Sequence, residues 1–134
     1  MLRLVIDTNV LISSFFGGNP KKVIDLWRRG RAILCLTQEV LEEYLRVIAR
    51  LPIELETKSK LVVILQEKRN IELVIPSKHY SVIREDPEDD KFIDCAVEAQ
   101  ADYIISGDEH LLRVRVYQGT PIYSPKEFLE IIGP

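Results

Sequence analysis

The stretch Leu2-Arg3-Leu4-Val5-Ile6 runs directly into Asp7-Thr8-Asn9 and decides the fold class. Its apolar residues form a short run without strict alternation, which is typical of a strand buried on both faces of a parallel sheet. A carboxylate and a carboxamide then follow at the carboxyl end of this strand, the edge at which open α/β sheets bind ligands. Asp7 or Thr8 could equally cap the next helix. The stretch therefore predicts an α/β fold and makes Asp7 a candidate site residue.

The rest of the chain alternates apolar strands with amphipathic helices. Four further strands are predicted at residues 32–36, 71–75, 103–105 and 121–123. Helices are predicted to start near residue 10 and to cover 21–29, 38–50, 55–68, 86–101 and 125–132. This alternation predicts a parallel sheet with helices on both faces. Since no repeat or linker interrupts the pattern, we expect residues 1–134 to form a single domain.

Composition gives a prediction about location but little about function. Hydrophobic residues make up 46% of the chain and charged residues 29%, as in ordinary globular proteins. No apolar run approaches the ~20 residues that a membrane helix needs, and the first residues lack a signal-peptide pattern, so we expect a cytoplasmic protein. Cys35 and Cys95 lie far apart and are predicted to be buried without a metal.

The net charge neither excludes nor favours a polyanionic substrate. It is −3, from 18 basic and 21 acidic residues. Without the four acids that are assigned below to one site, 17 acids face 18 basic residues, a balance of +1. Divalent cations bound at that site would offset its own charge.

Acidic residues converge on one edge of the predicted sheet. Asp7 ends the first strand and Asp108 follows the fourth. Glu43 lies beside the apolar stripe of the helix at 38–50, and Asp89 and Asp90 lie in the first turn of the helix that leads into the fourth strand. Each acid alone is more often structural, for example at a helix start. Together they would repel one another, and hard carboxylate oxygens suit Mg²⁺ or Mn²⁺.

Four motifs in the chain resemble those of PIN-domain nucleases, as found in VapC-type toxins and their stand-alone relatives. They are Val5-Ile6-Asp7-Thr8-Asn9-Val10-Leu11, Leu41-Glu42-Glu43-Tyr44, the segment at 86–93 and the segment at 101–108. The motifs occur in family order and span nearly the whole chain. The resemblance implies a three-layer α/β/α fold with a central parallel sheet of about five strands in the order 3-2-1-4-5. It also implies cleavage of single-stranded RNA with Mg²⁺ or Mn²⁺.

The resemblance further implies which side chains form the acidic pocket. The predicted set is Asp7, Glu43, Asp89 or Asp90, and Asp108, with Asn9 and Ser106 as polar supports. The third acid stays ambiguous, because the ungapped spacing to Asp108 favours Asp90 as the metal ligand, whereas helical phase favours Asp89. Asp94 is a possible accessory acid, and His79 and His110 are predicted to be surface residues.

The ligand set indicates a hydrolytic mechanism. A bound cation would polarise the scissile phosphate and lower the pKa of a bound water. With no histidine in the predicted pocket, water is the expected nucleophile, and the products should carry 5′-phosphate and 3′-hydroxyl ends. Basic residues expected to hold the RNA backbone are Lys21, Lys22, Arg28, Arg29 and Arg31.

Other functions compete with this prediction. A haloacid-dehalogenase-like phosphatase needs a second aspartate where Asn9 stands, and no lysine follows a late strand as a receiver domain requires. A catalytically silent PIN scaffold that binds RNA or a protein remains an alternative. Toxins of this type are usually neutralised by an antitoxin, a possible partner. We also expect a homodimer through the apolar helices at 20–29 and 55–68.

Overall fold

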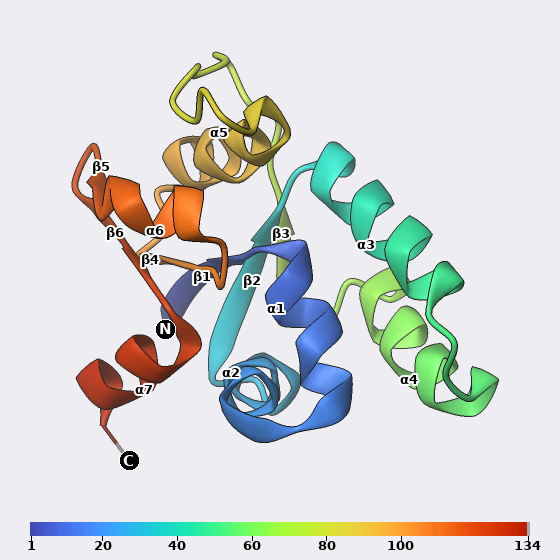
Figure 1. Cartoon of the computed structure of the whole chain (residues 1–134). Coiled ribbons are helices and arrows are strands. Elements are labelled where there is room, and N and C mark those ends of the chain that lie inside the picture. The colour runs from blue at the N-terminus through green and yellow to red at the C-terminus, as the bar shows by residue number, and fades with distance from the viewer. Residues whose placement is uncertain (134) are drawn as a thin grey trace.

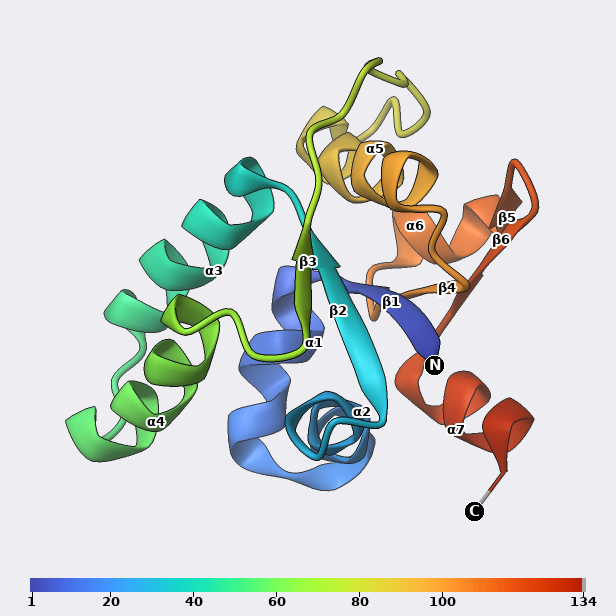
Figure 2. The same ribbon diagram turned by 180° about the vertical axis from the view of Figure 1, so that it is seen from behind.

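The computed structural model describes residues 1–133 and has a three-layer α/β/α fold around one sheet (Figures 1 and 2). The six strands are β1 (Leu2–Ile6), β2 (Ala32–Leu36), β3 (Ile71–Leu73), β4 (Tyr103–Ile105), β5 (Val116–Tyr117) and β6 (Thr120–Tyr123). Their order is β3-β2-β1-β4-β6-β5, and every pair except β5–β6 is parallel. The predicted fold class and strand order are therefore confirmed, with one additional strand.

The additional strand, β5, forms a hairpin with β6. The two residues between them, Gln118 and Gly119, both have positive φ angles, of 47° and 85°. Such turns match the twist of the strands they join, and glycine adopts the left-handed conformation without a steric cost. The sequence indicated only a possible extended segment at 114–117, and β5 occupies its last two residues.

The helices are α1 (Thr8–Ser13), α2 (Gly18–Arg28), α3 (Gln38–Arg50), α4 (Leu55–Gln66), α5 (Asp90–Ala99), α6 (Glu109–Val114) and α7 (Pro125–Ile132). Short 3₁₀ turns follow α1 at Ser14–Phe16 and precede α5 at Pro87–Asp89. Helix α5 packs against β1, β2 and β4 on one face of the sheet, and α1, α2 and α7 lie on the opposite face (Figure 1). Helices α3 and α4 form an antiparallel pair beyond β2 and β3 (Figure 2).

The first strand lies at the centre of the core. Leu4, Val5 and Ile6 are fully buried, as expected for a strand covered on both faces. Trp27 of α2 and Tyr44 of α3 are the largest side chains that pack against the sheet layer. Within residues 1–133, no helix has the length and apolarity that spanning a bilayer would require.

The sheet topology brings the ends of β1 and β4 together. These strands are parallel neighbours, with Ile6 opposite Ile105, and the Asp7 amide donates to the Ile105 carbonyl at 3.0 Å. The strand order reverses between them, because β2 and β3 lie on one side and β6 on the other. A crevice at such a reversal is the usual ligand site of open α/β sheets. Asp7 and Ser106 are therefore adjacent at this edge.

Candidate active site

Asp7 both caps a helix and faces the edge of the sheet. Its Oδ1 accepts from the Val10 amide at 2.8 Å, which caps α1, and its Oδ2 accepts from the Ser106 hydroxyl. Only 3% of Asp7 is exposed, and this burial raises the pKa of its carboxyl group, against the opposing effect of these hydrogen bonds. The helix-cap and site interpretations of Asp7 are thus compatible, since each uses a different oxygen.

Ser106 joins two of the predicted acids. Its hydroxyl donates to Asp7 and accepts from the Asp108 amide at 2.9 Å. The Asp108 side chain in turn accepts from the His110 amide at 2.7 Å, which caps α6. The side chain of Ser106 is fully buried, so it fixes the separation between the end of β1 and the turn that carries Asp108. Asn9, the other predicted support, is exposed and has no hydrogen bond to Asp7.

Glu43 reaches the same edge from α3. The Tyr44 hydroxyl donates to the Ile6 carbonyl, so α3 is tied to the last residue of β1 and Glu43 lies beside it. One Glu43 oxygen accepts from the Thr8 hydroxyl, and the other lies 2.7 Å from Lys91 Nζ. Thr8 and Lys91 are both buried. Thr8 was predicted only as a possible helix cap and Lys91 was not predicted as a site residue, although both lie inside the PIN-like motifs.

Asp89 and Asp108 form the closest acidic contact of the site. Burial and the proton that Asp89 shares with Asp108 raise the pKa of the Asp89 carboxyl group to about 8. For Asp108, burial opposes ionisation, but the hydrogen bond from Asp89 and those from backbone amides hold its pKa below the usual value. Among residues 1–133, Asp89 Oδ2 is the one buried side-chain polar atom without a hydrogen-bond donor. A carboxyl group with these neighbours is favoured either as the neutral acid or as a carboxylate beside a cation.

Asp90 is not brought into this cluster. Its Oδ1 accepts from the amides of Val82 and Ile83, at 3.0 and 2.8 Å, and its side chain is buried against that loop. The helical phase places Asp89, one residue earlier, toward Asp108. The ungapped spacing that favoured Asp90 as a ligand is misleading, because this helix begins with a 3₁₀ turn at Pro87–Asp89. Asp94 is likewise buried, and it lies 2.7 Å from the Nδ1 atom of His79, which is a surface residue as predicted.

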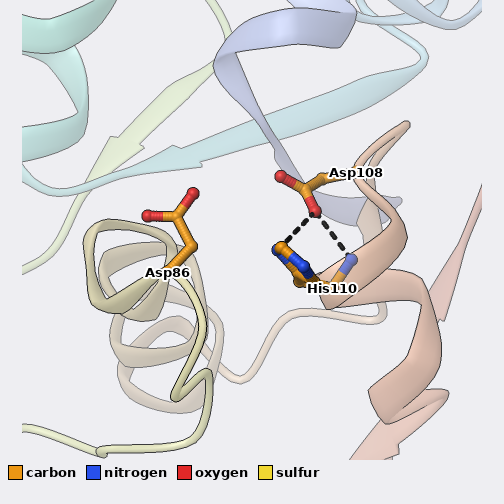
Figure 3. Close-up of side chains that lie close together, drawn as sticks. All are labelled: Asp86, Asp108 and His110. Carbon is orange, nitrogen blue, oxygen red and sulfur yellow. Dashed lines mark hydrogen bonds and ion pairs between the residues drawn. The ribbon is translucent and has the colours of Figure 1, made fainter.

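Two residues left out of the predicted pocket lie beside Asp108. Ligand atoms of Asp86, Asp108 and His110 all lie within 4.8 Å of one another, and Figure 3 shows Asp86 across from the other two. His110 Nδ1 is 3.7 Å from Asp108 Oδ1. His110 is partly exposed, as the prediction of a surface residue requires, but it lies beside Asp108, which was not predicted. It follows Asp108 by two residues at the start of α6, a helix that the sequence pattern did not predict.

These residues fit a divalent cation. Asp86, Asp108 and His110 offer ligand atoms that all lie within 4.8 Å of one another. Asp7 and Asp89 lie near enough to Asp108 for its charge to raise the pKa of their carboxyl groups, and Asp89 Oδ2 has no donor within the described chain. Hard carboxylate oxygens suit Mg²⁺ or Mn²⁺. These five residues could hold such an ion, with Glu43, which accepts from Thr8 next to Asp7, at the rim.

Comparison with known proteins identifies the family. The model of the PIN domain matches residues 3–110, a range that includes every acid of the cluster. The chain belongs to the PIN-domain family. The resemblance predicted from the four motifs is thereby confirmed, and the family supports a nuclease.

Two relatives of this PIN domain extend the match over most of the chain. An uncharacterized protein of Methanocaldococcus jannaschii, MJ1680, is 30% identical over 144 residues that cover 96% of this chain and 90% of the relative. The crystal structure of VapBC2 from Rickettsia felis bound to a DNA fragment from their promoter contains a chain with a similar fold. The TM-score is 0.58 at 13% identity, over 90% of this PIN domain and 97% of that chain.

The basic residues predicted to hold RNA are not all at one place: Lys22 lines a cavity with Asn19 and Lys126, near the site, whereas Arg31 and Lys21 lie elsewhere. Arg31 lines a cavity with Leu2, Asp102 and Tyr103, at the starts of β1 and β4 and thus at the opposite edge of the sheet. Lys21 pairs with Asp25 at 2.8 Å. Nearer the acids, a cavity of about 360 Å³ is lined by Asn9, Gly107 and Lys126, among others.

Proposed function

We propose that this PIN domain is an endoribonuclease that hydrolyses phosphodiester bonds of single-stranded RNA with Mg²⁺ or Mn²⁺. The observation that carries the proposal is the convergence of Asp7, Asp89 and Asp108 at the switch point of the sheet, with Asp89 Oδ2 lacking a donor in the described chain. Three acids that face one another are unfavourable without a cation. RNA as the substrate rests on the family resemblance.

The residues around the ion would divide the work. The bound cation supplies Lewis-acid stabilisation of the phosphate and a water of lowered pKa. Ser106 and the α1 cap fix the Asp7 carboxylate, so its geometry is set before substrate binds. Asp89, whose pKa is raised to about 8 by burial and by Asp108, would hold such an ion as a carboxylate and would give up its proton in doing so.

The identity of the product ends needs a direct test. The prediction of 5′-phosphate ends relied on a pocket without histidine, whereas His110 lies 3.7 Å from Asp108. The hydrolytic proposal keeps water as the nucleophile, because three carboxylates are available to hold the ion and orient that water. Products with a 2′,3′-cyclic phosphate would instead show that a ribose hydroxyl attacks.

The proposal also covers association with other proteins, through an apolar surface on α3 and α4 and with an antitoxin. Leu55 and Val63 of α4 are exposed, and a cavity of about 510 Å³ lies between α3 and α4. We propose that this apolar surface forms a homodimer contact. The structure of VapBC2 with promoter DNA supports an antitoxin as a further partner of this PIN domain. A toxin role would require such a protein to be encoded nearby.

The substitution Asp7→Asn tests the proposal. Asparagine keeps the α1 cap but removes a charge and an oxygen from the cluster. We expect Mn²⁺-dependent cleavage of single-stranded RNA to fall at least ~100-fold, because the ion supplies several kcal/mol of transition-state stabilisation. The free energy of unfolding in EDTA should change by less than about 1 kcal/mol, since lost repulsion offsets the lost Ser106 bond.

The matched control is Asp25→Asn, which removes a carboxylate that pairs with Lys21 outside the site. It should leave cleavage unchanged. Full activity of Asp7→Asn would refute the role of Asp7. Absence of metal-dependent cleavage in the unmutated protein, across several RNAs, would favour the silent scaffold.

A further inference from the structure

Lys91 places a buried positive charge among the acids of the site. Only 6% of its side chain is exposed, and its Nζ lies 2.7 Å from Glu43 Oε1. Its second acidic neighbour, Glu88, is 3.5 Å away and 84% exposed. Lysine is rarely buried without a partner, because the desolvated ammonium costs several kcal/mol. Glu43 is therefore the group that makes the buried position of Lys91 tolerable.

The Glu43 carboxylate is fully engaged by this chain. Oε1 pairs with Lys91, and Oε2 accepts from the Thr8 hydroxyl. Asp89, two residues before Lys91, has an oxygen without a donor among residues 1–133. The positive charge of Lys91 is thus paired with Glu43, whereas Asp89 Oδ2 remains without a donor in the described chain.

We propose that Lys91 is an internal counter-ion that competes with the divalent metal for Glu43 and so weakens metal binding. The inference rests on the proposed function, because it takes these acids as the metal site. In the metal-free chain the ammonium neutralises Glu43. A divalent ion bound nearby meets this fixed positive charge, and the two repel at short range. By linkage, any stabilisation that Lys91 gives to the metal-free form but not to the metal-bound form is subtracted from the affinity for the metal.

Calorimetric titration with MnCl₂ tests the inference without any cleavage step. Lys91→Met keeps the length of the side chain and removes the charge. We expect its dissociation constant for Mn²⁺ to fall on the order of tenfold. Lys91→Arg keeps the charge and should bind Mn²⁺ as weakly as the unmutated protein. Lys21→Met breaks a lysine–carboxylate pair of similar length outside the site and should leave Mn²⁺ affinity unchanged.

Thermal melts give a second, independent readout. Lys91→Met should lower the melting temperature in EDTA, where Glu43 and its neighbours lose their counter-ion. Saturating Mn²⁺ should shrink that difference, because the metal supplies the missing positive charge. If the methionine variant does not fold, Lys91→Gln carries the same expectations, since it can still donate to Glu43.

Three outcomes would overturn the inference. A purely structural lysine would lower the melting temperature equally with and without Mn²⁺ and leave the affinity unchanged. If Lys91 instead holds Glu43 in place for the metal, Lys91→Met would weaken Mn²⁺ binding. Failure of the unmutated protein to bind Mn²⁺ would reject the proposed function and this inference with it, whereas normal binding with an unimproved variant would reject the inference alone.

Discussion

Asp89 and Asp90 are consecutive carboxylates at the start of α5, yet they have opposite environments. Asp90 accepts two backbone hydrogen bonds, from Val82 and Ile83, and is 2% exposed. Asp89 faces Asp108, and its Oδ2 finds no donor in the described chain. A buried carboxylate with donors is a structural element, whereas one that faces another acid needs a proton or a cation. The chemistry of an aspartate is therefore decided by its neighbours and cannot be taken from its motif.

Asp90 is one of three acids on α5 that accept hydrogen bonds from backbone amides. Asp90, Asp94 and Glu98 are spaced by four residues and so lie on one face of the helix. Asp90 accepts from the amides of Val82 and Ile83, Asp94 from the amide of Tyr80, and Glu98 from the amide of Ser77. These three acids, called here the acid ladder, hold the segment at 77–83 against the helix. Asp86 follows that segment by a few residues and reaches the Asp108–His110 pair (Figure 3).

Replacing each aspartate in turn with asparagine should show most clearly how the roles of Asp89 and Asp90 differ. Asp89→Asn is expected to reduce metal-dependent cleavage at least ~100-fold, because it removes a proposed ligand. Its free energy of unfolding in EDTA at neutral pH should rise, because asparagine, unlike Asp89, needs no proton in the folded state. Cleavage assays beside urea denaturation would measure both effects.

Asp90→Asn should show the opposite pattern. Asparagine can accept the same amides without a charge, so we expect a loss of about 1–2 kcal/mol in unfolding free energy. Cleavage should fall less than about tenfold, since Asp90 faces the loop and not the site. If Asp90→Asn abolished cleavage while Asp89→Asn did not, the assignment of the third acid would be reversed.

The pH dependence of stability should separate the two acids further. Asp89 keeps its proton in the folded state up to about pH 8, because burial and Asp108 raise its pKa. In the unfolded chain it ionises near pH ~4. Between these values the folded state binds more protons, so stability falls as the pH rises, down to a plateau above the folded pKa. We expect the melting temperature in EDTA to decrease from about pH 4 to about pH 8 and to level off above that pH.

Two controls isolate the contribution of Asp89. Asp89→Asn should flatten the decrease, and saturating Mn²⁺ should reduce it by replacing the proton. His79 also contributes, because its hydrogen bond to Asp94 raises its pKa, and that stabilisation is lost as the pH rises through the raised value. This background should remain in Asp89→Asn. A decrease that is identical in both proteins would show that Asp89 is ionised at neutral pH.

The sequence predicted the sheet edge well because the relevant signals are local. The strand before Asp7 and the helices predicted at 38–50 and 125–132 all appear in the structure, where Thr37 and Ser124 cap the two helices. Asp7 and Asp108 are brought together because strand ends in a parallel sheet meet at one edge. None of these features depends on a distant side chain.

The remaining site could not be predicted because it depends on contacts across long sequence separations. The roles of Asp89 and Asp90 depend on a 3₁₀ turn and on which amides the loop at 77–83 presents. Lys91 resembles any helical lysine until α3 places Glu43 beside it. His110 joins the site because α6 starts at Glu109, in a segment whose pattern indicated only a turn.

The far end of the acid ladder gives the smallest expected effect. Glu98 Oε1 accepts from the Ser77 amide at 2.7 Å, but both residues are accessible to water, which can replace the bond. We therefore expect Glu98→Ala to lower the unfolding free energy by only about 0.5–1 kcal/mol. Amide hydrogen exchange should speed up at Ser77 and Tyr80 more than at Val82 and Ile83, which Asp90 holds independently.

Glu130→Ala, in an exposed position of α7, is the matched control and should change neither the unfolding free energy nor the exchange rates. Glu98→Ala should leave cleavage unaffected, because Glu98 holds Ser77, the end of the 77–83 segment that is farther along the chain from Asp86. Equal exchange at all four amides would show that the segment opens as one unit, and then Asp90 alone would not suffice to fix the loop next to the site.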